Sequence, residues 1–318
     1  MPNNSSAAVA SVQQQISFRV LLIQILVGIF LCVNMLLIVT FFKKECFHTS
    51  ARYILFAVML MSDSFVLVLS NLMVLVNSLQ FSIQVWLCTV ISIVTLLYVM
   101  ATPVTLTAMT LERYVAICLP LRHAELCSTR RSVHCILVIH CISSVPCLLI
   151  LSIFFATASF ELYQQRALCS VDMFLLQPWQ RHFWSAISQF YFLIMCIILV
   201  FCYIQIVKVA KAASGENKQS THRGMRTVIL HAFQLLLCLI QLWSPFTEAA
   251  ALKADVNLFM DIRYCNYLFF SVAPRCLSPL IYGLRDEIFF LALKNNIYLS
   301  LCGMKKRLQK VWSLLSEC

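Results

Sequence analysis

Two ionisable side chains, Asp63 and Arg275, stand inside long apolar stretches of this chain, where a charge is costly and marks a functional site by default. Opposite charges in such surroundings most simply neutralise each other, and a buried ion pair is costly to break. A channel or carrier would need a longer polar route than these two groups provide. A channel or carrier is therefore the weaker alternative to a protein in which the two charges neutralise each other.

A second charged group, Glu112 followed by Arg113 and Tyr114, closes one of the apolar stretches. Arginine is always charged and presents a planar fork of donors. The adjacent Glu112 can neutralise it in a resting state, and a change of shape would free it for another partner. The plainer reading is an arginine that anchors a helix end by extending to the membrane surface.

Catalytic and metal-binding patterns are absent from the sequence. There is no H-E-x-x-H, G-x-S-x-G or G-x-x-x-x-G-K, and no two of the 7 histidines lie four residues apart. His134 and His140 are six residues apart and fall on different helix faces. We therefore expect neither an enzyme nor a metal or cofactor site.

The composition places these groups in a membrane protein. Hydrophobic residues make up 61% of the 318 residues and charged residues 12%, with a mean hydropathy of +0.86. Soluble domains are about 45–50% apolar and about 25% charged. A water-soluble globular domain is excluded, and so is a disordered chain, which needs low hydrophobicity.

The apolar stretches predict an all-α membrane protein, since about 20 apolar residues cross a bilayer as a helix. We expect residues 1–318 to form a single seven-transmembrane-helix bundle, with a short amphipathic helix after the seventh span. The expected parts are an extracellular tail at 1–17, spans at about 18–42, 53–78, 85–118, 132–156, 183–210, 223–250 and 262–283, and a cytoplasmic tail at 284–318.

The basic residues predict the orientation. Most of the 24 Lys and Arg residues fall in the segments 43–52, 113–131, 208–226 and 285–318, which places these on the cytoplasmic side of the plasma membrane. There they would face anionic lipid rather than nucleic acid, because the charge is split over short loops. The N-x-Ser triplets at Asn3 and Asn4 are glycosylation acceptors if the N-terminus is extracellular.

Two longer motifs extend these observations. Residues 112–123 read ERYVAICLPLRH, and residues 278–286 read SPLIYGLRD. They resemble the E-R-Y-V-A-I-C-x-P-L-R-H and N-P-x-I-Y-x-L-R-N stretches of rhodopsin-like (class A) G-protein-coupled receptors, and more narrowly those of vertebrate odorant receptors, with fish-type members closest. The resemblance spans the chain through Asn34, Asp63, Cys88, Cys169, Glu112–Tyr114, Tyr203, Trp243, Pro245 and Ser278–Tyr282.

The resemblance implies a receptor that binds a small organic, odorant-like ligand in the bundle and activates a heterotrimeric G protein, raising cyclic AMP. The switch toward the G protein would comprise Glu112, Arg113, Tyr114, Tyr203, Ser278, Pro279 and Tyr282. A rhodopsin-like receptor for a lipid or a peptide is the alternative within the class. A channel or carrier is the alternative outside it.

Helix bends and a buried ion site follow from the same resemblance. Pro245 and Pro279 would bend their helices, and Trp243 would be a packing toggle, or else a plain core aromatic. The family holds a sodium ion beside the carboxylate that matches Asp63. Because Arg275 faces it here, we expect Arg275 to pair with Asp63 and displace the ion.

A departure from the family pattern in span 6 and the positions of the cysteines lead to further expectations. Span 6 begins with the basic Arg223 and Arg226, so no acidic residue there locks Arg113. Cys88 and Cys169 alone fall clearly on the outer side; with the resemblance they imply one disulfide, and two unpaired thiols are the alternative. Near the C-terminus, two cysteines lie beside the membrane and are either palmitoylated or unmodified, Cys302 and Cys318.

Helical spacing upward from Glu112 suggests which side chains line a ligand pocket. We expect an apolar, aromatic cavity with few polar groups, formed by Thr95, Val99, Met100, Ile187, Tyr191, Phe246, Ala250, Tyr264 and Leu268. Each of these residues also suits plain helix packing. Glu248, near the outer end of span 6, is either a ligand contact or a residue of the lipid interface.

Overall fold

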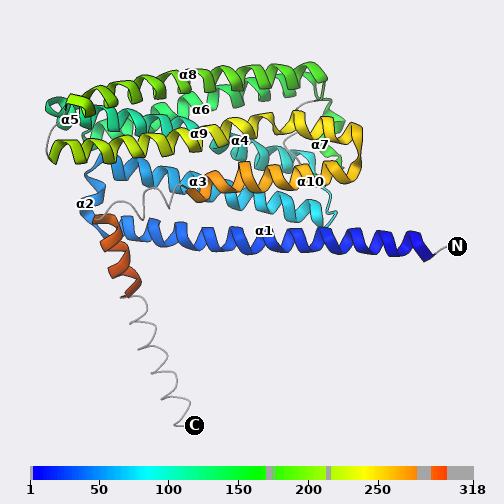
Figure 1. Ribbon diagram of the computed structural model, residues 1–318. Coiled ribbons are helices and arrows are strands. Elements are labelled where there is room, and N and C mark those ends of the chain that lie inside the picture. Colours follow the sequence, from blue (N-terminus) through cyan, green and yellow to red (C-terminus); the bar gives the residue numbers. More distant parts are fainter. Residues whose placement is uncertain (1–2, 170–173, 175, 213–215, 278–287, 299–318) are drawn as a thin grey trace, which may run out of the picture.

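The computed structural model describes residues 3–169, 174, 176–212, 216–277 and 288–298, and these are almost entirely helical (Figure 1). The long helices run side by side along one direction. They are α1 (Asn3–Lys43), α3 (Ala51–Ser78), α4 (Val85–Cys118), α6 (Thr129–Thr157), α8 (Pro178–Ala212), α9 (Glu216–Ala254) and the shorter α10 (Val256–Asn266).

Five of these helices contain segments that are long and apolar enough to cross a membrane: Ser17–Lys43, Ala51–Ser78, Val85–Cys118, Thr129–Thr157 and Trp179–Val209. They lie where the first five spans are expected. Large apolar side chains cover the outer surface of the bundle, for example Leu21, Phe65, Leu148 and Phe190, each at least 50% exposed. Such a surface suits hydrocarbon rather than water, and the chain is a multi-pass membrane protein.

Helix α4 lies at the centre and packs against α3, α6, α8 and α9. Its buried threonines return their hydroxyl hydrogen bonds to the carbonyl four residues earlier, as Thr105 does to Ala101 O (2.8 Å) and Thr110 to Leu106 O (2.9 Å). These bonds satisfy polar groups that would be costly to leave unpaired in the bundle. One continuous helix therefore links the two ends of the molecule, which are named outer (near Cys88) and inner (near Arg113) after the orientation expected from the sequence.

Short elements close the two ends of the bundle. At one end lie α7 (Phe160–Gln164) and the antiparallel pair of β1 (Ile83–Gln84) and β2 (Arg166–Ala167). Figure 1 shows α2 (Glu45–His48) and α5 (Pro120–Leu126) at the opposite end. The first of these ends carries the disulfide described below, and the second carries the charged group around Arg113.

The region of the expected seventh span is not one regular helix. α10 leads directly into a π-helix, η2 (Tyr267–Val272), and residues 273–277 are again α-helical. A π-turn holds an extra residue per turn and is frequent at functional sites. Residues 278–283 of the expected span lie outside the described part of the chain.

Both ends of the described chain add detail to the expectations. α1 begins at Asn3, so its helix runs through the segment expected as a tail; that segment holds neither Gly nor Pro after Pro2 to interrupt a helix. Residues 288–298 are helical and dock at the inner end, where Phe289 packs on Phe47 and Asn296 accepts a hydrogen bond from Lys43 Nζ (2.6 Å).

Candidate functional site

The predicted disulfide between Cys88 and Cys169 is confirmed and sits at the outer end of α4, with a Cα–Cα distance of 5.5 Å. It joins the first turn of α4 to the loop after β2. Asn77 Nδ2, at the end of α3, donates to Cys169 O (2.8 Å), and Val85 N donates to Gln165 O (3.0 Å). The loop is thereby fixed against two helix ends.

A cavity of about 440 Å³ opens next to this disulfide, between α1, α3, α4, α9, α10 and η2. Four residues expected in a ligand pocket line it, namely Thr95, Val99, Met100 and Tyr264. Apolar side chains supply most of its surface, among them Val66 and Leu96. The volume falls in the range of small-molecule sites, about 300–1,000 Å³.

Five expected pocket residues do not line this cavity: Ile187, Tyr191, Phe246, Ala250 and Leu268. On α9 the cavity face carries Gln241, Ser244 and Glu248, spaced three and four residues apart, so Phe246 lies off that face. Phe246 instead packs between His182 and Trp243, with ring centroids at 6.0 and 6.1 Å. The cavity is displaced from α8 toward α1 and α3.

Two of the charged residues in the cavity lining, Arg19 and Arg263, were not expected there. Charged residues line the cavity at its outer rim, namely Arg19, Glu248 and Arg263. Arg19 Nη2 forms an ion pair with Asp261 Oδ1 (2.6 Å), and its guanidinium lies 5.4 Å from the centroid of the Tyr264 ring. The one sequence signal for this rim is the presence of arginines near the outer ends of two apolar stretches.

Trp243 does not have the surroundings expected of a packing toggle below the pocket. Its side chain is 50% exposed, and it is absent from the cavity lining. The reason is the rotation of α9, which turns Gln241 and Ser244 inward and Trp243 toward the outside. Pro245 lies within α9, but its side chain is not part of the described structure.

A buried polar group lies between the cavity and the inner end. Asp63 is fully buried and accepts a hydrogen bond from Thr102 Oγ1 (3.0 Å), while Asn34 Nδ2 donates to Ser64 Oγ (3.1 Å). Arg275 is 2% exposed and donates from Nη1 to the carbonyl oxygen of Ser271 in η2.

The structure brings Asp63 and Arg275 into one neighbourhood without a direct ion pair between them. No carboxylate oxygen of a described residue lies within 4.0 Å of the Arg275 nitrogens. The two segments nevertheless meet, because Leu67, one turn after Asp63, packs in one apolar cluster with Cys276, the residue after Arg275. Their pairing therefore remains a prediction.

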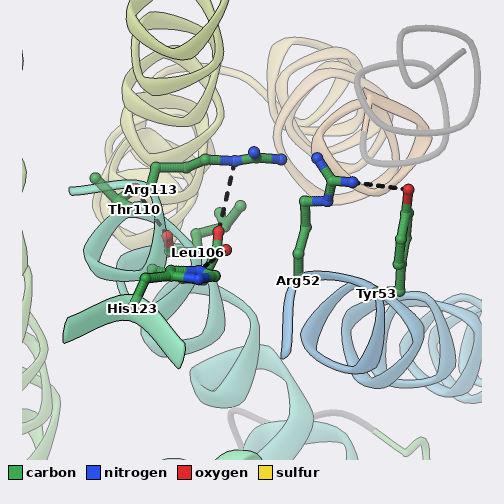
Figure 2. A network of polar contacts seen from close by, with 7 residues as sticks. Arg52, Tyr53, Leu106, Thr110, Arg113 and His123 are labelled. Atoms are coloured by element: carbon green, nitrogen blue, oxygen red, sulfur yellow. Dashed lines mark hydrogen bonds and ion pairs between the residues drawn. The ribbon is translucent and has the colours of Figure 1, made fainter. Parts of the chain in front are cut away.

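The inner end of α4 carries the charged group that the sequence singles out. Glu112 lies between two partners, with its Oε2 3.6 Å from Arg113 Nε and its Oε1 3.5 Å from His123 Nε2 on α5. Figure 2 shows the Arg113 side chain extending toward Arg52 of α3, which donates to the Tyr53 hydroxyl (2.7 Å). The contact of Glu112 with His123 was not expected from the sequence.

Three more observations define this inner site. The Tyr114 ring packs against Phe201 of α8, with centroids 5.7 Å apart, and Tyr203 is half-buried on the same helix. Burial raises the pKa of the Cys127 thiol, which follows α5, and the negative charge of Glu112 raises this pKa further. Arg113 is thus held within a compact polar cluster at the membrane edge.

Several expected residues fall outside what the structure describes. These are Ser278, Pro279, Tyr282, Cys302 and Cys318, together with the side chains of Asn3, Asn4, Arg223 and Arg226. Among the residues that are described, no three His, Cys, Asp or Glu side chains gather in a way that could hold a metal ion.

A known protein family and two known proteins are similar to this sequence. The model of the 7 transmembrane receptor (rhodopsin family) matches residues 33–282. Odorant receptor 131-2 of Danio rerio is 41% identical over 302 residues, which cover 95% of this chain and 92% of that protein. A rhodopsin sequence of Coregonus autumnalis is 25% identical over 127 residues, 38% of this chain and 97% of that sequence.

Proposed function

The chain belongs to the rhodopsin family of seven-transmembrane receptors, and from this premise we propose that it is an odorant receptor that binds a small organic ligand in the cavity beside Cys169. The long similarity to an odorant receptor of Danio rerio supports the ligand class. The family couples to heterotrimeric G proteins. The proposed signal is activation of the olfactory stimulatory type, with a rise in cyclic AMP.

One observation carries this proposal: a single helix, α4, lines the ligand cavity at one end and holds the charged switch at the other. Thr95 and Met100 face the cavity, and Glu112 with Arg113 follows more than three helical turns below. A ligand that favours one arrangement of α4 and its neighbours shifts the population of that arrangement. The altered inner end then receives the G protein.

The proposed topology has seven spans with an extracellular N-terminus in the plasma membrane. α9 would be the sixth span, and α10 with η2 and residues 273–277 would begin the seventh. The helix at 288–298 would lie on the cytoplasmic surface, because its Phe289 is buried while Lys294 is exposed. Asn3 and Asn4 would carry glycans outside the cell.

The switch proposed here has Glu112, Arg113, Tyr114 and Tyr203 as its described members, with Ser278, Pro279 and Tyr282 completing it. Glu112 restrains Arg113 in the resting state, and His123 of α5 helps to hold the carboxylate in place. Release of Arg113 toward Tyr203 and the G protein defines the active state.

Replacing Glu112 by glutamine should raise ligand-independent signalling about fivefold, the population change that about 1 kcal/mol of lost restraint produces. The measurement is basal cyclic AMP at matched surface expression. Glu125→Gln is the control, because Glu125 is an exposed acid on α5 that pairs with Arg131 (3.2 Å) and does not touch the switch. Equal basal signals in the two variants would remove Glu112 from the resting-state restraint.

The experiment for the function as a whole is a panel of odorants applied to cells that express the chain with an olfactory stimulatory α subunit. A cyclic AMP response to some member of the panel, absent in cells without the receptor, is the expected result. Silence from a receptor confirmed at the surface would contradict the odorant assignment.

A further inference from the structure

Two arginines line the cavity, which was expected to be apolar and aromatic with few polar groups. Arg19 reaches it from α1 and Arg263 from α10. Arg263 and Tyr264 share one face of α10 with Met260 and Tyr267, because these positions are three or four residues apart. Both guanidinium groups therefore border the same opening.

The two arginines differ in how fully they are engaged. Arg19 is paired with Asp261, a carboxylate that is 56% exposed, and it also lies over the Tyr264 ring. The guanidinium of Arg263 lies 5.7 Å from the Phe259 ring centroid, and within the described residues no carboxylate oxygen is within 4.0 Å of it. Arg263 is thus available to a ligand anion, and Arg19 can share one.

Away from the arginines, the cavity favours an apolar part of a ligand. The Thr95 hydroxyl bonds Ile91 O (2.8 Å), and the hydroxyls of Ser70 and Tyr267 bond each other (3.1 Å). These polar groups already have partners in the protein, so a ligand gains little by adding polar atoms there. Val66, Leu96 and Met100 supply the apolar wall around them.

We propose that the ligand is an amphipathic anion, with a carboxylate or similar head between Arg19 and Arg263 and an apolar body directed toward Met100. This inference rests on the proposed ligand-binding function and names the ligand class of that same cavity. Arginine suits the head because its planar fork matches a carboxylate with two parallel hydrogen bonds. The acid in the cavity lining, Glu248, accepts a hydrogen bond from Asn266 Nδ2 (3.1 Å), and Asp261 neutralises Arg19, so Arg263 is the cation left to attract the head group.

The test uses the full chain in lipid nanodiscs and three probes of equal length: decanoate, 1-decanol and decylamine. Binding is followed through tryptophan fluorescence, since Trp184 lines the cavity, with empty nanodiscs as the control for partition into lipid. Decanoate should bind about tenfold tighter than decanol, and Arg263→Gln should remove that advantage while decanol affinity stays within about twofold.

Two further variants keep the test independent of folding. Arg263→Glu should reverse the preference, so that decylamine binds tighter than decanoate. Lys253→Gln is the matched control, because Lys253 is an exposed cation at the end of α9 that does not line the cavity. Equal affinity for decanoate and decanol, tightest binding of decylamine to the unaltered chain, or an equal loss in the Lys253 variant would overturn the proposal.

A parallel G-protein assay tests the proposed receptor function separately from the inference of an anionic ligand. Decanoate that binds through Arg263 supports the inference, and in that case an inactive G protein would count against the receptor mechanism alone. A cyclic AMP response to neutral odorants that is unchanged in Arg263→Gln would overturn the anionic ligand and leave the odorant receptor standing.

Discussion

Replacing Cys88 by serine should remove most of the receptor from the cell surface and abolish the ligand response of what remains. The disulfide closes a sequence separation of 81 residues, and loss of such a bond costs about 2–5 kcal/mol. Cys169 also lines the cavity and presents its carbonyl to Asn77, so its release opens the cavity wall. Surface labelling and ligand-driven cyclic AMP measure the two effects.

Cys265→Ser is the matched control for that change, because Cys265 is an exposed free thiol on α10. It should leave both readouts close to those of the unaltered chain. The double variant Cys88→Ser with Cys169→Ser should lose no more than either single change, since the bond is already absent in each. Normal expression and signalling of Cys88→Ser would contradict the structural role of the disulfide.

Arg275→Gln should impair expression and activation more than ligand affinity. Arg275 is 2% exposed, its guanidinium holds the Ser271 carbonyl of η2, and it is the buried cation near Asp63. Where the two charges pair, as predicted, removing one of them costs about 3–5 kcal/mol. Surface level, agonist potency and maximal cyclic AMP separate stability from activation.

Sodium dependence sharpens this second prediction. Without the nearby guanidinium, the negative charge of Asp63 should attract sodium, so Arg275→Gln should make signalling sodium-sensitive. The added change Asp63→Asn should restore expression and remove that sensitivity. Lys208→Gln on exposed α8 surface is the control. Normal signalling by Arg275→Gln, with no response to sodium, would contradict the pairing.

The sequence predicted the parts of the molecule that depend on local composition. Long apolar segments predicted five spans whose ends lie within four residues of those of the apolar helices, because a bilayer requires about 20 such residues per helix. The contact of Glu112 with Arg113 follows from their adjacency on one helix. The disulfide followed from two cysteines on the oxidising side.

The sequence did not predict how each helix is rotated about its own axis. In a membrane, lipid is as apolar as the bundle interior, so hydrophobicity does not mark the inward face. Counting upward along α4 selected Thr95 and Met100, which line the cavity, because they share a helix with Glu112. The same reasoning failed for Phe246 and Trp243 on α9, whose orientation is set by contacts with other helices.

The π-helix and the polar rim also needed the structure. A single extra residue in the turn at η2 leaves no distinct sequence pattern, yet it places Tyr267 and Ser271 on the cavity wall. Arg19 and Arg263 lie far apart in the sequence, and only the packing of α1 beside α10 joins them at one opening. Their charge is the basis of the proposal that the small organic ligand is an amphipathic anion.

The most direct test of the receptor mechanism measures nucleotide exchange on a purified heterotrimeric G protein. The full chain in lipid nanodiscs is compared with Arg113→Ala at equal receptor amount, each with a ligand whose binding has been measured. Ligand should accelerate exchange by the unaltered chain, and Arg113→Ala should bind the ligand equally well without accelerating exchange. Equal acceleration by both proteins would contradict the proposed switch at the inner end of α4.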